Sequence, residues 1–203
     1  MLETLKIDPR LNGDKVKEVL DYPEVIRVIK FDEESCEKFQ HDLNSAVGTG
    51  QEVVPVVVDS FGGQIYTVMG MIAAIEQCPV PVATILTTKA MSCGSALFCF
   101  GTEGYRYMHP DATIMIHDAS WGSHGKVEDV KNDAQHPEDM NKRLFKKMAK
   151  QIGHPPDYIL NLIREHSHVD WFLSAKEAKR HNIANHLKIP SLQVEVTVQV
   201  NFG

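Results

Sequence analysis

A serine, a histidine and an aspartate stand along the chain in settings that suit the three members of a catalytic triad. Ser92 follows an apolar, β-branched run and precedes a run of small and apolar residues, so its hydroxyl is expected at a strand-to-helix turn. His117 ends a second apolar run, and Asp170 opens the sequence DWFLS. A serine hydroxyl needs a base to remove its proton, and an acid that orients the base completes the arrangement. The chemistry predicted is nucleophilic attack on a carbonyl, as in a serine peptidase.

Two backbone N–H groups are predicted to bind the oxyanion that this attack produces. Gly63 has no side chain, so a substrate oxygen can approach its amide closely. Cys93 directly follows the nucleophile, and its amide is expected to point inward. The helix expected to begin here adds unpaired N–H groups and a partial positive charge. Removing one such donor typically raises the barrier by about 2.7–4 kcal/mol, so the glycine loop would matter as much as the triad.

Each of these residues also has a purely structural interpretation. Ser92 could serve only as the N-cap of the helix. His117 could be a core histidine with satisfied ring nitrogens, and Asp170 could cap the helix that follows it. Gly62–Gly63 could simply make a tight turn. Cys93 is a rival nucleophile, but its apolar surroundings favour a buried, neutral thiol.

Two further arrangements stay open. Lys89 lies three residues before Ser92, which allows a Ser-Lys dyad, although solvation at a strand end is the more usual state of such a lysine. His166, His168 and Asp170 alternate and would share one face of a strand, as metal ligands can. A His-x-His pair is frequent by chance in a chain with ten histidines, so we expect neither a metal nor an organic cofactor.

Strands and helices alternate along the chain, which favours an α/β fold with a parallel sheet covered by helices. Strands are expected at Val25–Lys30, Val53–Asp59, Val80–Thr88, Tyr105–Met108, Thr113–Ile116 and Leu192–Val200. Helices are expected at Glu33–Val47, Gln64–Gln77, Ser92–Phe100, Val127–Gln151, Pro156–Glu165 and Ala175–His181. His136–Pro137 predicts a kink or a fresh start within the longest helix, because proline is costly inside one.

Composition limits the classes of protein that the chain can represent. With 203 residues and 43% hydrophobic content, we expect one domain, residues 1–203. A net charge of −6 and scattered basic residues argue against nucleic-acid binding. The chain has neither an apolar run near the roughly 20 residues of a membrane helix nor a basic, hydrophobic start, so a cytoplasmic protein is expected. Four cysteines without CxxC spacing argue against a disulfide framework or a zinc knuckle.

Four sequence blocks, in this order, resemble the proteolytic subunit of the Clp protease family. They are DSFGG at 59–63, AMSCGSAL at 90–97, HPDATIMIHD at 109–118 and DWFLSAKEA at 170–178. The resemblance covers roughly residues 27–187, and the spacing between the second and third blocks also matches the family. It implies that Ser92 is the nucleophile, His117 the base and Asp170 the acid, with Gly63 and Cys93 as oxyanion donors.

The resemblance also implies a fold and an assembly. The fold is the crotonase-like α/β core with a protruding helical handle, expected at about residues 119–152 after the Gly- and Ser-rich segment 120–125. The assembly is a pair of stacked heptameric rings, a tetradecamer whose chamber confines the cleavage of peptide substrates. An AAA+ unfoldase would deliver those substrates and hydrolyse the ATP, since this chain has no Walker-type GxxxxGK[ST] sequence.

The chain departs from the family pattern in several segments. Segment 59–63 reads DSFGG where the family usually has Asn-Ser-Pro-Gly-Gly, which predicts a different substrate preference. His168 and Val169 replace an acidic-basic pair that links ring assembly to activity, and strand 53–58 lacks the aromatic residues that help to dock an unfoldase. The segment before Asp170 is longer than expected, which makes Glu165 its nearest competitor.

The two ends of the chain and two other functions complete the interpretation. Residues 1–25 form a divergent N-terminal segment, and residues 190–203 form a tail expected to be an edge strand.

One alternative function is a catalytically silent, structural ring subunit. The other is a crotonase-type acyl-CoA enzyme, which shares the core and would not need Ser92. The aligned serine, histidine and aspartate argue against both.

Overall fold

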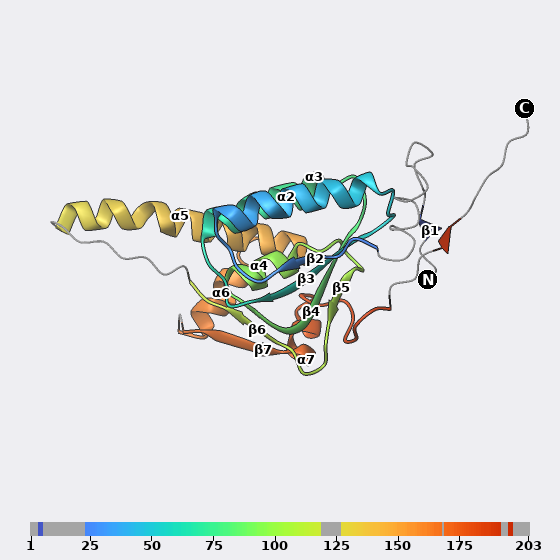
Figure 1. Cartoon of the computed structure of the whole chain (residues 1–203). Coiled ribbons are helices and arrows are strands. Elements are labelled where there is room, and N and C mark those ends of the chain that lie inside the picture. The colour runs from blue at the N-terminus through green and yellow to red at the C-terminus, as the bar shows by residue number, and fades with distance from the viewer. Residues whose placement is uncertain (1–3, 6–22, 119–126, 168, 192–194, 197–203) are drawn as a thin grey trace, which may run out of the picture.

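A six-stranded mixed sheet forms the centre of the computed structural model, which describes residues 4–5, 23–118, 127–167, 169–191 and 195–196 (Figure 1). The strands are β2 (Ile26–Val28), β3 (Val54–Ser60), β4 (Val82–Met91), β5 (Arg106–Met108), β6 (Thr113–Ile116) and β7 (Trp171–Ser174). Their order is β2-β3-β4-β6-β7, and β5 also pairs with β4. All pairs are parallel except β6 with β7.

Six helices accompany the sheet in the described part of the chain. They are α2 (Glu33–Gly48), α3 (Ile65–Gln77), α4 (Cys93–Cys99), α5 (Val127–Gln151), α6 (Tyr158–Glu165) and α7 (Ala175–Arg180). Neighbouring helices contact one another in the order α2, α3, α4, α5, and α2 and α4 also contact β3. The first half of α5 extends away from the sheet in Figure 1. The α/β class expected from the alternation of elements is confirmed.

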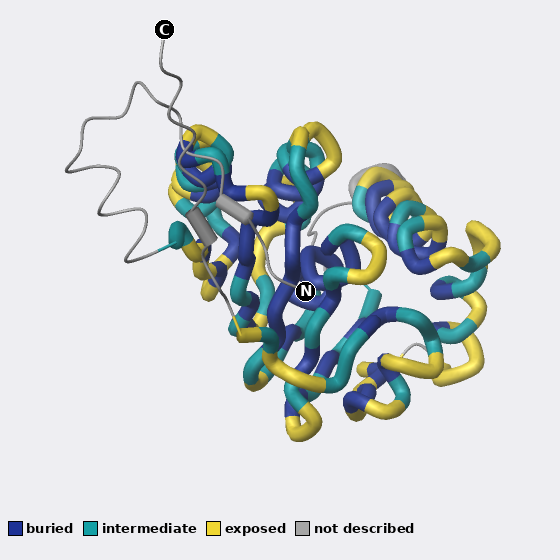
Figure 2. Tube along the Cα trace, turned by 90° about the vertical axis from the view of Figure 1, so that its right-hand side faces the viewer, coloured by how far each residue is buried: buried dark blue, intermediate teal, exposed yellow. Residues whose placement is uncertain are grey.

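Apolar side chains from the strands and the inner helix faces form one core cluster. Val54, Val56 and Val58 of β3 are fully buried, as a central strand covered by helices requires. Figure 2 shows the same pattern along the trace, with buried positions in the strands and exposed ones on the outer turns. Asp32 caps α2 through a capping box with Ser35, which fixes where that helix begins.

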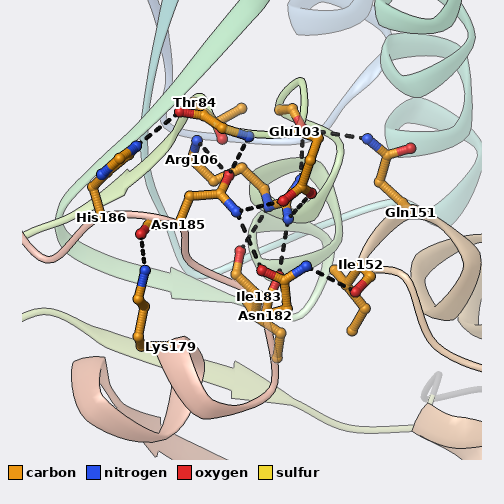
Figure 3. A network of polar contacts seen from close by, with 12 residues as sticks. Thr84, Glu103, Arg106, Gln151, Ile152, Lys179, Asn182, Ile183, Asn185 and His186 are labelled. Carbon is orange, nitrogen blue, oxygen red and sulfur yellow. Dashed lines mark hydrogen bonds and ion pairs between the residues drawn. The ribbon is translucent and has the colours of Figure 1, made fainter.

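A buried arginine joins β5 to the chain that follows α7 (Figure 3). Arg106 is 0% exposed, and its guanidinium donates to the carbonyls of Ile183, Gly101 and Asn182 at 2.9–3.1 Å. It also lies 2.6 Å from a carboxylate oxygen of Glu103. Because three carbonyls and one carboxylate accept from the guanidinium, the charge is tolerated inside the protein and ties distant segments together.

The sequence analysis predicted most helices and strands correctly, but several of their first or last residues differ in the structure. β4 ends at Met91 rather than Thr88, so the strand runs directly into Ser92. β2 is limited to Ile26–Val28, and α6 begins at Tyr158 rather than Pro156. β7 was not predicted, and its antiparallel pairing makes the sheet mixed rather than parallel. β5 and β6 both pair with β4 and are not paired with each other.

Two other expectations concern the long helix and the tail. A kink or a fresh start was expected at His136–Pro137; α5 is one continuous helix through Pro137, so the fresh start is wrong. The predicted tail strand at 192–200 is limited, within the described residues, to β8 (Glu195–Val196), which pairs with β1 (Thr4–Leu5) in a separate two-stranded sheet. The Gly- and Ser-rich segment 120–125 and most of segment 1–25 lie outside the described residues. No helix in the described part of the chain is long and apolar enough to cross a membrane.

Candidate active site

Ser92 occupies a sharp turn between β4 and α4. Its φ of 53° is in a region that favours glycine, so the backbone is strained there. The backbone N–H donates to the carbonyl of Met115 at 2.9 Å, which ties the turn to β6. Although Ser92 is the N-cap residue of α4, its side chain makes no capping hydrogen bond. The hydroxyl is therefore not used as a helix cap, which removes the simplest structural explanation of this serine.

The glycine loop after β3 lies directly against Ser92. Gly62 has φ of 106°, and a Cβ added there would lie 2.7 Å from the Cβ of Ser92. Gly63 has φ of 156°, and a Cβ there would lie 2.4 Å from the carbonyl oxygen of Phe31. Both positions therefore require glycine for steric as well as conformational reasons. Gly62 can approach Ser92, and Gly63 can approach Phe31, only because neither has a side chain.

The two predicted oxyanion donors lie next to each other. The thiol of Cys93 donates to the carbonyl of Gly63, with the sulfur 3.2 Å from the oxygen. Within the described residues, no loop or turn carbonyl accepts a hydrogen bond from the N–H of Gly63 or of Cys93. Burial raises the pKa of the Cys93 thiol, and backbone hydrogen bonds from these two residues act against that rise. Backbone N–H groups that lie near a serine hydroxyl and are not committed to a carbonyl are suited to bind a developing oxyanion.

His117 directly follows β6 and faces the same cavity as Ser92. Its Nδ1 lies 3.8 Å from Oδ1 of Asp170, which directly precedes β7. The antiparallel pairing of β6 with β7 matches Ile116 to Trp171 and so brings the histidine beside the aspartate. The side chain of His117 is 22% exposed and that of Asp170 is 55% exposed.

The three candidate residues are thus brought into one region, but without tight contacts. The separation of 3.8 Å between His117 and Asp170 is an ion-pair distance and is longer than a hydrogen bond. Among the described side chains, no hydrogen bond joins Ser92 to His117. Catalytic hydrogen bonds are often long in unliganded enzymes and shorten when substrate binds, so this geometry is compatible with a triad. Asp170 lies within ion-pair distance of His117, and no ion pair joins Glu165 to this histidine in the described part of the chain.

A cavity of about 550 Å³ opens beside Ser92 and His117. The glycine loop contributes Phe61 and Gly63 to its wall. The opposite wall comes from α5, through the side chains Met140, Asn141, Leu144, Phe145 and Met148. A mainly apolar cavity with a few polar groups in its lining is typical of a substrate site.

The sequence analysis missed this contribution of α5, which it treated only as a handle. Met140, Leu144 and Met148 recur every four residues and are buried, so the helical pattern could have indicated an inner face. It also missed the contact of Tyr66 with His136, whose hydroxyl and Nε2 lie 2.6 Å apart at the edge of the cavity. That contact joins residues seventy positions apart and has no local sequence signal.

The rival nucleophile and the rival base are both engaged elsewhere. Cys93 is buried, and burial raises the pKa of its thiol, so the thiolate is disfavoured. Lys89 donates to a carboxylate oxygen of Asp59 at 2.6 Å, which occupies the amine that a Ser-Lys dyad would need. All four cysteines lie in described segments, and none of them forms a disulfide.

The residues considered for a metal site are only partly described. His168 lies outside the described residues. Nδ1 of His166 lies 2.8 Å from the carbonyl oxygen of Leu162, and the ring packs against Trp171. Among the residues that were described, no group of three or more histidine, cysteine, aspartate or glutamate side chains could hold a metal ion.

Comparison with models of known protein families gives a match that covers most of the chain. Residues 15–188 match the family model described as Clp protease. The match includes the glycine loop, Ser92, His117 and Asp170, and it also includes β2 to β7 of the central sheet.

Proposed function

We propose that this chain, which belongs to the Clp protease family, is a serine endopeptidase whose nucleophile is Ser92. The observation that carries the proposal is the turn at Ser92. Its hydroxyl does not cap the helix and faces a cavity shared with His117, and the N–H groups of Gly63 and Cys93 donate to no loop or turn carbonyl among the described residues.

The proposed reaction proceeds through an acyl-enzyme. His117 takes the proton from Ser92 as the hydroxyl oxygen attacks the scissile carbonyl, and it returns that proton to the leaving amine. Asp170 holds the imidazole in the required tautomer and stabilises the imidazolium, without itself taking the proton. The N–H groups of Gly63 and Cys93 bind the oxyanion. Water then hydrolyses the ester, and no metal or organic cofactor takes part in these steps.

The assembly is proposed by resemblance to the family. We infer that the chain forms heptameric rings stacked in pairs, with α5 as the handle between them, and that an AAA+ partner delivers substrates to the chamber in the cytoplasm. The extension of α5 away from the sheet supports the handle. Native mass spectrometry tests the assembly, since two rings of seven require the mass of fourteen chains.

Peptide hydrolysis by assembled protein tests the reaction. We expect Ser92→Ala and His117→Ala to lower kcat by three orders of magnitude or more, roughly the cost of losing a triad member. Asp170→Asn should cost about 10⁴-fold through the wrong tautomer, whereas the control Glu165→Gln should keep wild-type activity. Equal losses in Asp170→Asn and Glu165→Gln would contradict the assignment of the acid. Turnover of acyl-CoA thioesters by Ser92→Ala would indicate the crotonase-type enzyme instead.

A further inference from the structure

The pairing of β3 with β4 is irregular immediately before the candidate site. Val58 pairs with Leu86, but Ser60, two residues further along β3, pairs with Ala90, four residues further along β4. The extra residues in β4 include Thr88 and Lys89, so the strand bulges at this point. Bulges next to active sites commonly redirect side chains, and this one lies between the core of the sheet and Ser92.

One carboxylate on β3 spans the bulge. Oδ1 of Asp59 accepts a hydrogen bond from the hydroxyl of Thr88 at 2.7 Å and another from the ammonium of Lys89 at 2.6 Å. The hydrogen bond from Lys89, followed by that from Thr88, lowers the pKa of Asp59, so the carboxylate is ionised at neutral pH. Charge-assisted hydrogen bonds of this kind are the stronger ones, and both begin in the irregular part of β4.

The same lysine also contacts the loop. Its ammonium lies 4.5 Å from the ring centroid of Phe61, a cation–π contact that places the ring beside the cavity. Phe61 is 78% exposed, so little besides Lys89 restrains this side chain. The next residue, Gly62, donates its N–H to the hydroxyl of Ser60 at 3.0 Å. Contacts from both strands therefore converge on the segment that carries Gly63.

We propose that Asp59, Thr88 and Lys89 form a brace that fixes the segment Phe61–Gly63 against Ser92. Asp59, in β3, precedes Gly63 by four residues, and Lys89, in β4, precedes Ser92 by three. Lys89 is also paired with Thr113 of β6, the strand that leads to His117. The three residues are positioning residues, because they touch neither the reacting oxygen nor a substrate.

The catalytic consequence of the brace rests on the proposed peptidase function. An oxyanion donor acts mainly in the transition state, so a misplaced Gly63 lowers kcat and leaves KM nearly unchanged. A displacement of about 1 Å can reduce a rate by as much as about 100-fold. We therefore expect Asp59→Asn and Lys89→Met each to lower kcat about tenfold or more. Their combination should be no slower than the slower single variant, because the groups act as one unit.

Three comparisons make the experiment specific. Lys89→Arg keeps the charge and should retain most of the activity, which a purely steric role would not predict. Lys142→Met removes an exposed ion pair with Glu138 on α5 and should leave kcat unchanged. Amide hydrogen exchange, which needs no activity, should be faster in residues 60–64 of Asp59→Asn than in wild type, with the α2 amides unchanged. Wild-type kcat and unchanged exchange in Asp59→Asn would overturn the brace.

The outcomes separate this proposal from the proposed function. If wild type cleaves no peptide, the peptidase proposal fails. Hydrogen exchange in residues 60–64 then still shows whether the brace fixes the segment Phe61–Gly63. If wild type is active and exchange in residues 60–64 changes without any loss of kcat, the brace has no catalytic role and the proposal is overturned. Faster exchange together with a loss of kcat at constant KM would support it.

Discussion

Ser92 combines a strained backbone with a hydroxyl that its helix does not use. A non-glycine residue at φ of 53° costs about 1–3 kcal/mol, and such strain persists only where neighbouring contacts hold it. The hydrogen bond to Met115 and the close approach of Gly62 are two such contacts. A glycine would relieve the strain but would remove the hydroxyl. Serine at this strained position therefore fits the proposed role as nucleophile better than a role in stability.

Gly62 provides a matched test of the close approach. In Gly62→Ala the new Cβ would lie 2.7 Å from the Cβ of Ser92, so the loop and the serine must move apart. We expect peptide hydrolysis to fall about 100-fold, as for a misplacement of about 1 Å.

Gly104→Ala is the control for this substitution. Gly104 also has a positive φ, of 87°, but a Cβ there has no atom within 4 Å. Both variants should lose stability by about 1 kcal/mol from the backbone conformation, measured by thermal unfolding. Equal activities in the two variants would show that the contact with Ser92 is unimportant.

At the scale of the elements, β5 depends on its buried arginine. Arg106→Met would leave the carbonyls of Asn182 and Ile183 without their donor, whereas that of Gly101 would keep the side-chain amide of Gln151. Each buried group left unsatisfied costs about 1–3 kcal/mol, so we expect a loss of about 3 kcal/mol or more in the free energy of unfolding, measured with urea. Lys142→Met, which breaks an exposed ion pair, should cost less than about 1 kcal/mol. Similar losses in the two variants would contradict the role assigned to Arg106.

The elements also show what the sequence could and could not predict. Long periodic segments such as α2 and α5 were placed to within a residue, because many positions contribute to the pattern. β7 was missed because four residues give too short an alternation, even though Trp171 and Leu173 are buried and Phe172 is not. Local patterns cannot predict which strands pair or in which register.

The candidate site also has features that the sequence could predict and features that it could not. Ser92, His117 and the glycine loop were predicted from their local settings and the family resemblance, and the structure places them around one cavity. The bulge in β4 and the contacts of Asp59 with Lys89 depend on the register between two strands, which no local pattern fixes. The apolar wall from α5 depends on where the helix packs.

At the scale of the whole molecule, one core cluster supports every element of the central sheet. Cys99 lies within this core, and burial raises the pKa of its thiol from 9.0 to about 12. Above about pH 9 the unfolded chain releases this proton while the folded chain keeps it. The contribution of Cys99 to stability is therefore complete below pH 9 and is lost as the pH rises toward 12.

This predicts a specific alkaline loss of stability. Between about pH 9 and pH 11 the free energy of unfolding of wild type should fall more steeply than that of Cys99→Ala, by at most roughly 1.4 kcal/mol per pH unit. Urea unfolding at a series of pH values measures the two slopes. Although Cys99→Ala should be less stable at neutral pH because of its lost packing, only the slopes decide the prediction. Identical slopes would contradict the raised pKa.

The central claim is that Ser92 is an activated nucleophile, and its reaction with a fluorophosphonate probe tests this most directly. Intact-mass spectrometry of assembled protein should show one adduct on wild type and on Cys93→Ala, and none on Ser92→Ala. An adduct retained by Ser92→Ala would place the nucleophile elsewhere. The absence of an adduct on assembled wild type would contradict the account and favour a catalytically silent ring subunit.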